Sequence, residues 1–262
     1  MPTHRSWLAR LFLAASIVGA LVALPGVSAA KETAPKGPSP WCAPEVEALP
    51  GNVCYLDGNS KSQARRTLVI FLHGAIAKNT NWSQNHERMM LRVAKATNIE
   101  ILFPQSPLTE AGYVWPGSLE KQQAVEQELI DGWMAAKRLV EKRDGRAFDD
   151  VFVMGFSSGA YFASSLAMRG RLDVDGYAVF AGGQPMPARA TPVERFSPVF
   201  VGICGNDDTT AAHSRAFVGS LRAAGIPSAS NEQPVGHGVD AVHFNSALAF
   251  LRNKNKARFA MR

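Results

Sequence analysis

The sequence predicts an α/β fold of three layers, in which a mostly parallel sheet is covered by helices on both faces. From Thr67 onward, short apolar runs alternate with longer segments of helical periodicity, and this alternation is typical of a parallel sheet with crossover helices. Residues 149–167 also read as a strand, a sharp turn and a packed helix. Ligands of such sheets bind at the carboxyl ends of the strands, so the polar residues there are the candidates for a functional site.

The predicted strands are short and apolar, and the predicted helices carry apolar residues at helical spacing. The strands are expected at 67–72, 99–103, 151–154, 177–181, 199–204 and 228–233. The helices are expected at 82–96, at 119–142, from Ser158, at 210–224 and at about 240–252. No internal repeat and no second apolar core stands out, so residues 41–262 are predicted to form a single domain.

Residues 1–30 have the pattern of a secretory signal peptide. Two arginines precede an apolar run, 11–24, that is too short to span a bilayer, and small residues for cleavage follow it. An uncleaved membrane anchor is the alternative. Cleavage would leave 28 − 2 = 26 basic residues against 22 acidic ones. We therefore expect a secreted or periplasmic protein with no membrane span after cleavage.

Residues 31–40 contain three prolines and are expected to form a flexible tether. Basic residues gather again in the last eleven positions, and we interpret this tail as a solvated end and not as a nucleic-acid-binding arm. No nucleic-acid partner is expected, and the protein is expected to be a monomer.

Two cysteines lie in the N-terminal part of the predicted domain. Export implies an oxidising compartment, in which Cys42 and Cys54 could close the loop around Pro50 and Gly51 with a disulfide. The alternative is a pair of reduced, buried thiols. Cys204 lies in an apolar run and is expected to be a core residue.

The turn after the predicted strand 151–154 has the spacing G-x-S-x-G around Ser157. Gly155 and Gly159 allow a close approach of strand and helix, which would leave the Ser157 hydroxyl exposed at the tip of a strained turn. The pattern favours a nucleophilic serine. A glycine-rich turn that only binds an anion is the alternative.

A second glycine turn follows the strand 67–72 at His73 and Gly74. Acyl transfer needs N–H donors for a developing oxyanion, and the backbone N–H groups of Ala75 and Ser158 are the candidates for this oxyanion hole. His73 precedes the serine and is expected to brace the turn.

A serine nucleophile needs an imidazole and a carboxylate, and later strand ends supply both. Asp207 and Asp208 follow the strand 199–204, and the G-x-x-D spacing from Gly205 selects Asp208, which leaves Asp207 as the helix cap. His237 lies between two glycines. Its rival His243 falls on the apolar pattern of the last helix, so His237 is the predicted base.

These landmarks together resemble the α/β-hydrolase superfamily over roughly residues 67–252. The order serine, aspartate, histidine is that of the superfamily. Its exported, capless branch of polyhydroxybutyrate depolymerase-like and feruloyl or acetyl esterase-like enzymes is the most similar, although Ala160 replaces a glycine that is frequent there. The resemblance implies that Trp115 lines an acyl or alcohol pocket; a packing tryptophan is the alternative. The short segment 182–198 implies that no cap domain covers the site.

The predicted function is that of a secreted serine carboxylesterase that acts on a small or polymeric ester. No metal or organic cofactor is expected, because the six histidines show no helical ligand spacing. Two alternatives stay open, a serine peptidase or amidase with the same residues and a non-catalytic binding protein on the same fold.

Overall fold

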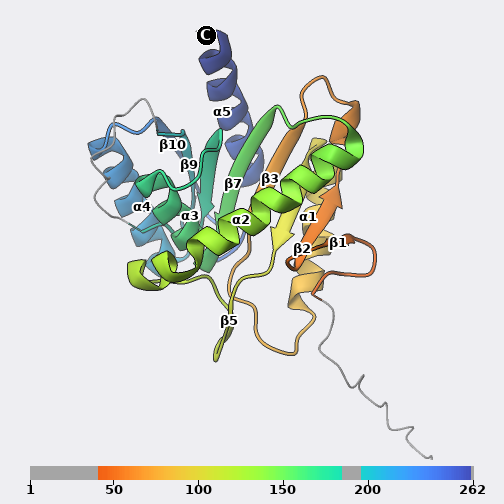
Figure 1. The fold of residues 1–262 in the computed structure, drawn as a ribbon. Coiled ribbons are helices and arrows are strands. Elements are labelled where there is room, and N and C mark those ends of the chain that lie inside the picture. Colours follow the sequence, from red (N-terminus) through yellow and green to blue (C-terminus); the bar gives the residue numbers. More distant parts are fainter. Residues whose placement is uncertain (1–40, 185–195, 261–262) are drawn as a thin grey trace, which may run out of the picture. The chain divides into compact units, whose positions relative to one another are not determined.

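The computed structural model describes residues 41–184 and 196–260. Its centre is an 8-stranded sheet in the order β1-β2-β4-β3-β7-β8-β9-β10, and a small hairpin, β5-β6, lies beside it (Figure 1). All strands from β4 to β10 in this order pair in parallel, whereas β1 and β2 are antiparallel. The predicted α/β architecture is confirmed.

The strands of the large sheet are β1 (Glu47–Leu49), β2 (Val53–Asp57), β3 (Thr67–Leu72), β4 (Glu100–Pro104), β7 (Asp150–Phe156), β8 (Gly176–Phe180), β9 (Val199–Cys204) and β10 (Ser228–Gln233). The hairpin consists of β5 (Leu108–Thr109) and β6 (Gly112–Tyr113). The helices are α1 (Trp82–Thr97), α2 (Leu119–Asp144), α3 (Ser158–Arg169), α4 (Asp208–Ala223) and α5 (Ala241–Ala260), with a 3₁₀ turn at Ser60–Ser62.

The central strands are apolar at every position because helices cover both faces of the sheet. Alternate residues of a strand point to opposite faces. In β3, Leu68 and Ile70 pack into the core beneath α2, α3 and α4, whereas Val69 and Phe71 pack into the core beneath α1 and α5. Figure 1 shows α2 crossing one face of the sheet. Each core joins the sheet to the helices on one of its faces, which gives the three-layer fold.

The strand order reverses between β3 and β7. From β3 the chain crosses through α1 to β4 on one side, and β7 then lies on the other side of β3. Ligands of such sheets bind beside the strand ends at this point of reversal. Leu72 of β3 is paired with Gly155 of β7, so the residues that follow these two strands begin side by side.

Three parts of the fold differ from the sequence prediction. The antiparallel strands β1 and β2 and the hairpin β5-β6 were not predicted, because they are short and β1 and β5 are largely exposed, which leaves no clear alternation to read. Helix α5 continues to Ala260, eight residues beyond the predicted end. Helix ends are set by local capping more than by the apolar pattern.

The predicted signal peptide and the predicted tether lie outside the described residues. In the described part of the chain, no helix is both long enough and apolar enough to cross a membrane. Between β8 and β9, residues 185–195 are also outside the described ranges. The described remainder of that connection contains no helix or strand.

Candidate active site

Ser157 lies at the tip of the turn between β7 and α3, where it adopts φ 52° and ψ −119°. A residue with a side chain rarely adopts this conformation, and it is kept only where the surrounding structure enforces it. Its carbonyl accepts hydrogen bonds from the N–H groups of Ala160 and Tyr161, and its own N–H donates to Phe180 of β8. These three hydrogen bonds hold the strained turn, which places the Ser157 side chain at the carboxyl edge of the sheet.

The two glycines of the motif permit this close approach. A Cβ atom at Gly155 would lie 2.3 Å from the carbonyl oxygen of Gly159, and one at Gly159 would lie 2.1 Å from the carbonyl oxygen of Leu72. Both distances are far below van der Waals contact. Helix α3 can pack directly against β3 and β7 only because neither position carries a side chain.

The structure brings His237 to Ser157. The Nε2 atom of His237 lies 2.9 Å from Oγ of Ser157, within hydrogen-bonding distance although the two residues are 80 positions apart. His237 belongs to the loop after β10. Asn206 fastens this loop, since its N–H donates to the carbonyl of Val235 and its amide donates to the carbonyl of Pro234.

Asp207 is the carboxylate that faces the histidine, so the prediction of Asp208 is wrong. The Nδ1 atom of His237 lies 2.6 Å from Oδ2 of Asp207, and Oδ1 of the same carboxylate accepts from the N–H of Thr210. Hydrogen bonds from Thr210 and then from His237 lower the pKa of Asp207. The carboxylate is therefore ionised at neutral pH.

The physical reason for this correction is the start of α4. The helix begins at Asp208, two residues earlier than predicted, which makes Asp207 the N-cap residue with extended backbone. A carboxylate has two oxygens, so one side chain caps the helix and contacts His237 at the same time. The sequence analysis assigned these two roles to different residues.

The other histidines stand apart from this arrangement. His73 is buried, its Nδ1 donates to the Gly74 carbonyl at 2.5 Å, and its Nε2 accepts from the N–H of Ser106 at 3.3 Å. Burial lowers the pKa of His73 to about 4, which keeps the ring neutral. This geometry agrees with the expected bracing role. His243 is buried on α5 beneath β9, away from the strand ends, as its helical pattern indicated.

The candidate oxyanion donors flank Ser157. Ser158 is the first residue of α3, where a backbone N–H has no acceptor within the helix. Ala75 is exposed in the turn after β3, directly after Gly74. A Cβ atom at Gly74 would lie 3.3 Å from Cβ of Ser157, so this turn passes immediately beside the serine. Both N–H groups thus belong to segments that border the Ser157 side chain.

Trp115 is a buried residue of the core, and its indole N–H donates to the carbonyl of His73 at 2.9 Å. Its ring packs against Trp133 and Phe162, which agrees with the alternative of a packing tryptophan. One edge of Trp115 nevertheless lines a largely apolar cavity of about 450 Å³. The other apolar lining residues are Pro107, Ala111, Val114, Pro116, Ala124 and Val125.

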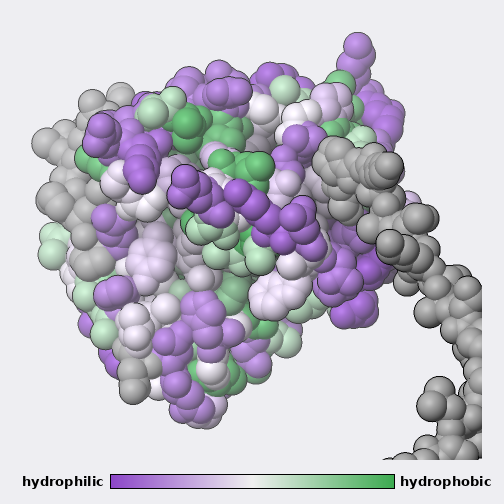
Figure 2. Space-filling model, turned by 90° about the horizontal axis from the view of Figure 1, so that it is seen from below, coloured by the Kyte–Doolittle hydropathy of each residue, from purple (hydrophilic) through white to green (hydrophobic). Residues whose placement is uncertain are grey.

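Trp115, which lines this cavity, contacts the turn that passes beside Ser157. Trp115 bonds to His73 at the start of the turn, and Tyr113 of β6 forms a bridge with Ile76 at its end. Figure 2 looks onto this face of the molecule, where apolar residues surface between hydrophilic ones. Polar side chains and apolar surface therefore lie on the same face of the molecule.

One pair of side chains that borders the site was not predicted from the sequence. The hydroxyl of Tyr161 lies 2.6 Å from Nδ1 of His213, and this pair joins α3 to α4 at the rim. Burial and then the charge of Asp207 raise the pKa of Tyr161. A tyrosine four residues after the serine lies on the same helix face as the turn, and that spacing could have indicated its proximity.

The predicted disulfide between Cys42 and Cys54 is confirmed, with an S–S distance of 2.08 Å. Cys204 is a buried thiol, as expected, and its Sγ donates to the carbonyl of Gly238 in the His237 loop at 3.3 Å. Among the described residues, no group of three or more His, Cys, Asp or Glu side chains could hold a metal ion.

The fold is the α/β-hydrolase fold. No protein-family model matches the chain, and a search of curated proteins found no similar sequence. Several solved structures are similar to it. A carboxylesterase from Mesorhizobium loti is 20% identical, with a TM-score of 0.57 over 79% of this chain and 98% of the other.

Two further solved structures have the same fold. Acyl-protein thioesterase 2 from Zea mays is 17% identical, with a TM-score of 0.56 over 78% of this chain and 99% of that protein. A carboxylesterase from Bacillus cereus is 18% identical, with a TM-score of 0.55 over 78% of this chain and 94% of the other. At these identities the similarity establishes the α/β-hydrolase fold. The resemblance to one exported branch stays a prediction.

Proposed function

We propose that this protein is a serine hydrolase that cleaves carboxylic esters through an acyl-enzyme on Ser157. The observation that carries the proposal is the chain of contacts from Ser157 Oγ to His237 Nε2, at 2.9 Å, and from His237 Nδ1 to Asp207 Oδ2, at 2.6 Å. A serine hydroxyl is a weak nucleophile unless an adjacent base takes its proton, and this chain of contacts supplies the base and its orienting carboxylate.

Each residue has a defined part in the proposed reaction. Ser157 attacks the ester carbonyl while His237 takes the hydroxyl proton, and the N–H groups of Ala75 and Ser158 stabilise the oxyanion. His237 then gives the proton to the leaving alcohol. Water, activated by the same histidine, releases the acid from Ser157. Asp207 stays ionised and stabilises the charged imidazole throughout.

Esters are favoured over amides because an alkoxide leaves more easily than an amide nitrogen. The apolar cavity lined by Trp115 supports an ester with an apolar acyl or alcohol part, since Trp115 also contacts the turn that passes beside Ser157. The solved carboxylesterases and the acyl-protein thioesterase of this fold agree with such a substrate.

A secreted or periplasmic location completes the proposal. It is supported by the leader pattern of residues 1–30 and by the Cys42–Cys54 disulfide, because disulfides persist in oxidising compartments. Expression of the full chain in a bacterial host, followed by fractionation and mass measurement of the mature N-terminus, tests this location. Retention of the intact chain in the cytosol would contradict it.

The activity is tested with purified protein and p-nitrophenyl esters of several acyl lengths, beside peptide anilides. Hydrolysis of the esters is expected, and a fluorophosphonate probe should label the wild type. Ser157→Ala should abolish both, whereas Ser220→Ala, a change on the outer part of α4, should abolish neither. Labelling that does not depend on Ser157 would contradict the mechanism. Preferential cleavage of the anilides would indicate the peptidase alternative.

A further inference from the structure

The turn that carries Ala75 is anchored at both ends by residues outside it. We call residues His73–Ile76 the oxyanion loop. At its start, the His73 carbonyl accepts from the indole of Trp115 at 2.9 Å. At its end, Ile76 and Tyr113 exchange two backbone hydrogen bonds, at 3.0 and 2.9 Å. The position of the Ala75 N–H therefore depends on where these two anchors hold the chain.

Trp41 packs against a residue at each anchor. Its ring centroid lies 5.3 Å from that of His73 and 5.0 Å from that of Tyr113. It also packs on Phe103 of β4, and only 9% of Trp41 is exposed. The Trp41 side chain, at the start of the described chain, thus packs against both ends of the oxyanion loop.

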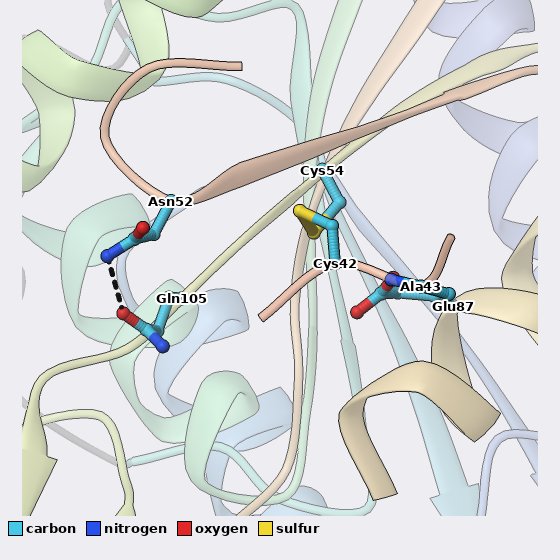
Figure 3. Close-up of a disulfide and its surroundings, with 6 residues drawn as sticks. All are labelled: Cys42, Ala43, Asn52, Cys54, Glu87 and Gln105. Atoms are coloured by element: carbon cyan, nitrogen blue, oxygen red, sulfur yellow. Dashed lines mark hydrogen bonds between the residues drawn. A yellow bond between two sulfur atoms is a disulfide. The ribbon is translucent and has the colours of Figure 1, made fainter. Parts of the chain in front are cut away.

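Covalent and polar contacts of its neighbours hold Trp41 in this place. The next residue, Cys42, is bonded to Cys54 of β2, which is paired with Phe103 in the sheet. The N–H of Ala43 donates to Oε2 of Glu87 on α1 at 2.6 Å (Figure 3). In the described ranges, the indole N–H of Trp41 has no hydrogen-bond partner. Packing and this tether, rather than a hydrogen bond of its own, fix the ring.

We propose that Trp41 is a positioning residue for the oxyanion loop and that the Cys42–Cys54 disulfide fixes it there. This proposal rests on the proposed function, because the loop matters for catalysis only if Ala75 stabilises an oxyanion. Loss of the ring lets His73 and Tyr113 shift. A donor displaced by a fraction of an ångström stabilises the transition state less, while the bound ester is little affected.

The kinetic test compares Trp41→Ala and Trp41→Phe with Trp82→Ala, a matched removal of an indole that is 56% exposed on α1. Trp41→Ala is expected to lower kcat by about tenfold or more, with KM changed by less than about twofold. Trp41→Phe should recover most of the loss because it keeps a ring against His73 and Tyr113. A phenylboronic acid forms a tetrahedral adduct on a nucleophilic serine. Its affinity for Trp41→Ala should fall by about the same factor as kcat.

The tether is tested with the double variant Cys42→Ala, Cys54→Ala. This double variant should also lower kcat. The triple variant, which adds Trp41→Ala, should be no slower than Trp41→Ala alone, because both changes act on one loop. Additive losses in the triple variant would overturn the role given to the disulfide. Melting temperatures are measured for every variant, and the assays are run well below the lowest of them.

Hydrogen exchange tests the positioning without any substrate. The amides of Ile76 and Tyr113, which bond to each other's carbonyl oxygens at the end of the loop, are expected to exchange about tenfold faster or more in Trp41→Ala, with no change in β9. Unchanged exchange and unchanged kcat would overturn the proposal. If the wild type shows no Ser157-dependent turnover, the proposed function fails, and the exchange result alone then decides whether Trp41 positions this loop.

Discussion

Oδ2 of Asp207 and Nδ1 of His237 lie 2.6 Å apart, and Oδ1 of the same aspartate accepts from the N–H of Thr210 at the start of α4. One carboxylate thus joins the loop after β9, the loop after β10 and a helix N-terminus. The imidazole is held in the tautomer that leaves Nε2 free to accept the Ser157 proton. The geometry of this aspartate determines whether the histidine can act.

Replacement of Asp207 should therefore disable the enzyme. Asp207→Asn is expected to lower kcat by about 10³- to 10⁴-fold, because the amide no longer stabilises a charged imidazole or fixes its tautomer. Asp208→Asn, one position along, should keep kcat within about threefold of the wild type, measured on the same ester. The reverse result would show that the two aspartates exchange roles in solution.

Gly159 should tolerate no side chain. Gly159→Ala places a methyl group 2.1 Å from the Leu72 carbonyl oxygen, so α3 must move away from β3, and we expect a loss of more than about 2 kcal/mol in unfolding free energy. Gly132→Ala, in the open middle of α2, has no atom within 4 Å and should gain about 0.5–1 kcal/mol. Urea denaturation measures both. Equal stability of the two variants would be incompatible with this packing.

Glu87 should make stability depend on pH. Burial raises the pKa of Glu87 from 4.5 to about 7, so between these values the folded state binds more protons than the unfolded state. The unfolding free energy from this group therefore falls as pH rises through that window and stays low above it. Glu87→Gln should be more stable than the wild type at pH 8, by about 1–3 kcal/mol, and close to it at pH 4.5.

The control for this prediction is Glu45→Gln, since Glu45 pairs with Arg88 at the surface. The unfolding free energy of Glu45→Gln, taken relative to that of the wild type, should be no higher at pH 8 than at pH 4.5. Thermal unfolding across pH 4.5–8 measures all three proteins. A Glu87→Gln profile parallel to that of the wild type would contradict the raised pKa.

The buried ion pair of Arg66 and Glu100 should be far more sensitive than a surface pair. Glu100 accepts two hydrogen bonds from Arg66, and further ones from Tyr55 and Ser60, with both charged side chains fully buried. Glu100→Gln leaves a buried guanidinium with less compensation, and we expect a loss of about 3 kcal/mol.

The matched control is Glu232→Gln, which weakens the exposed pair with Arg215. It should change the unfolding free energy by less than about 1 kcal/mol. Chemical denaturation of both variants at neutral pH gives the comparison. Equal losses would mean that burial does not govern the contribution of these pairs.

Much of the architecture could be predicted because both faces of the central strands are buried. Continuous apolar runs such as those of β3 and β9, separated by helical periodicity, identify a covered parallel sheet without any contact information. Gly155 could be interpreted for a similar reason, since the close approach to Gly159 that it permits is local to one strand, one turn and one helix, whereas the contact of Gly159 with Leu72 of β3 is not local. The edge strands β1 and β2 and the hairpin β5-β6 left no such signal.

The sequence by itself indicated the covered parallel sheet, the strained serine turn and the histidine in its glycine-flanked loop, because each leaves a pattern in residues that are neighbours along the chain. Only the tertiary structure decided between Asp207 and Asp208, since that choice depends on where α4 begins and on how the loop after β10 approaches it. It also placed Trp41 beneath the oxyanion loop. That contact joins segments more than thirty positions apart, and a pattern of neighbouring residues cannot predict a contact at such a sequence separation.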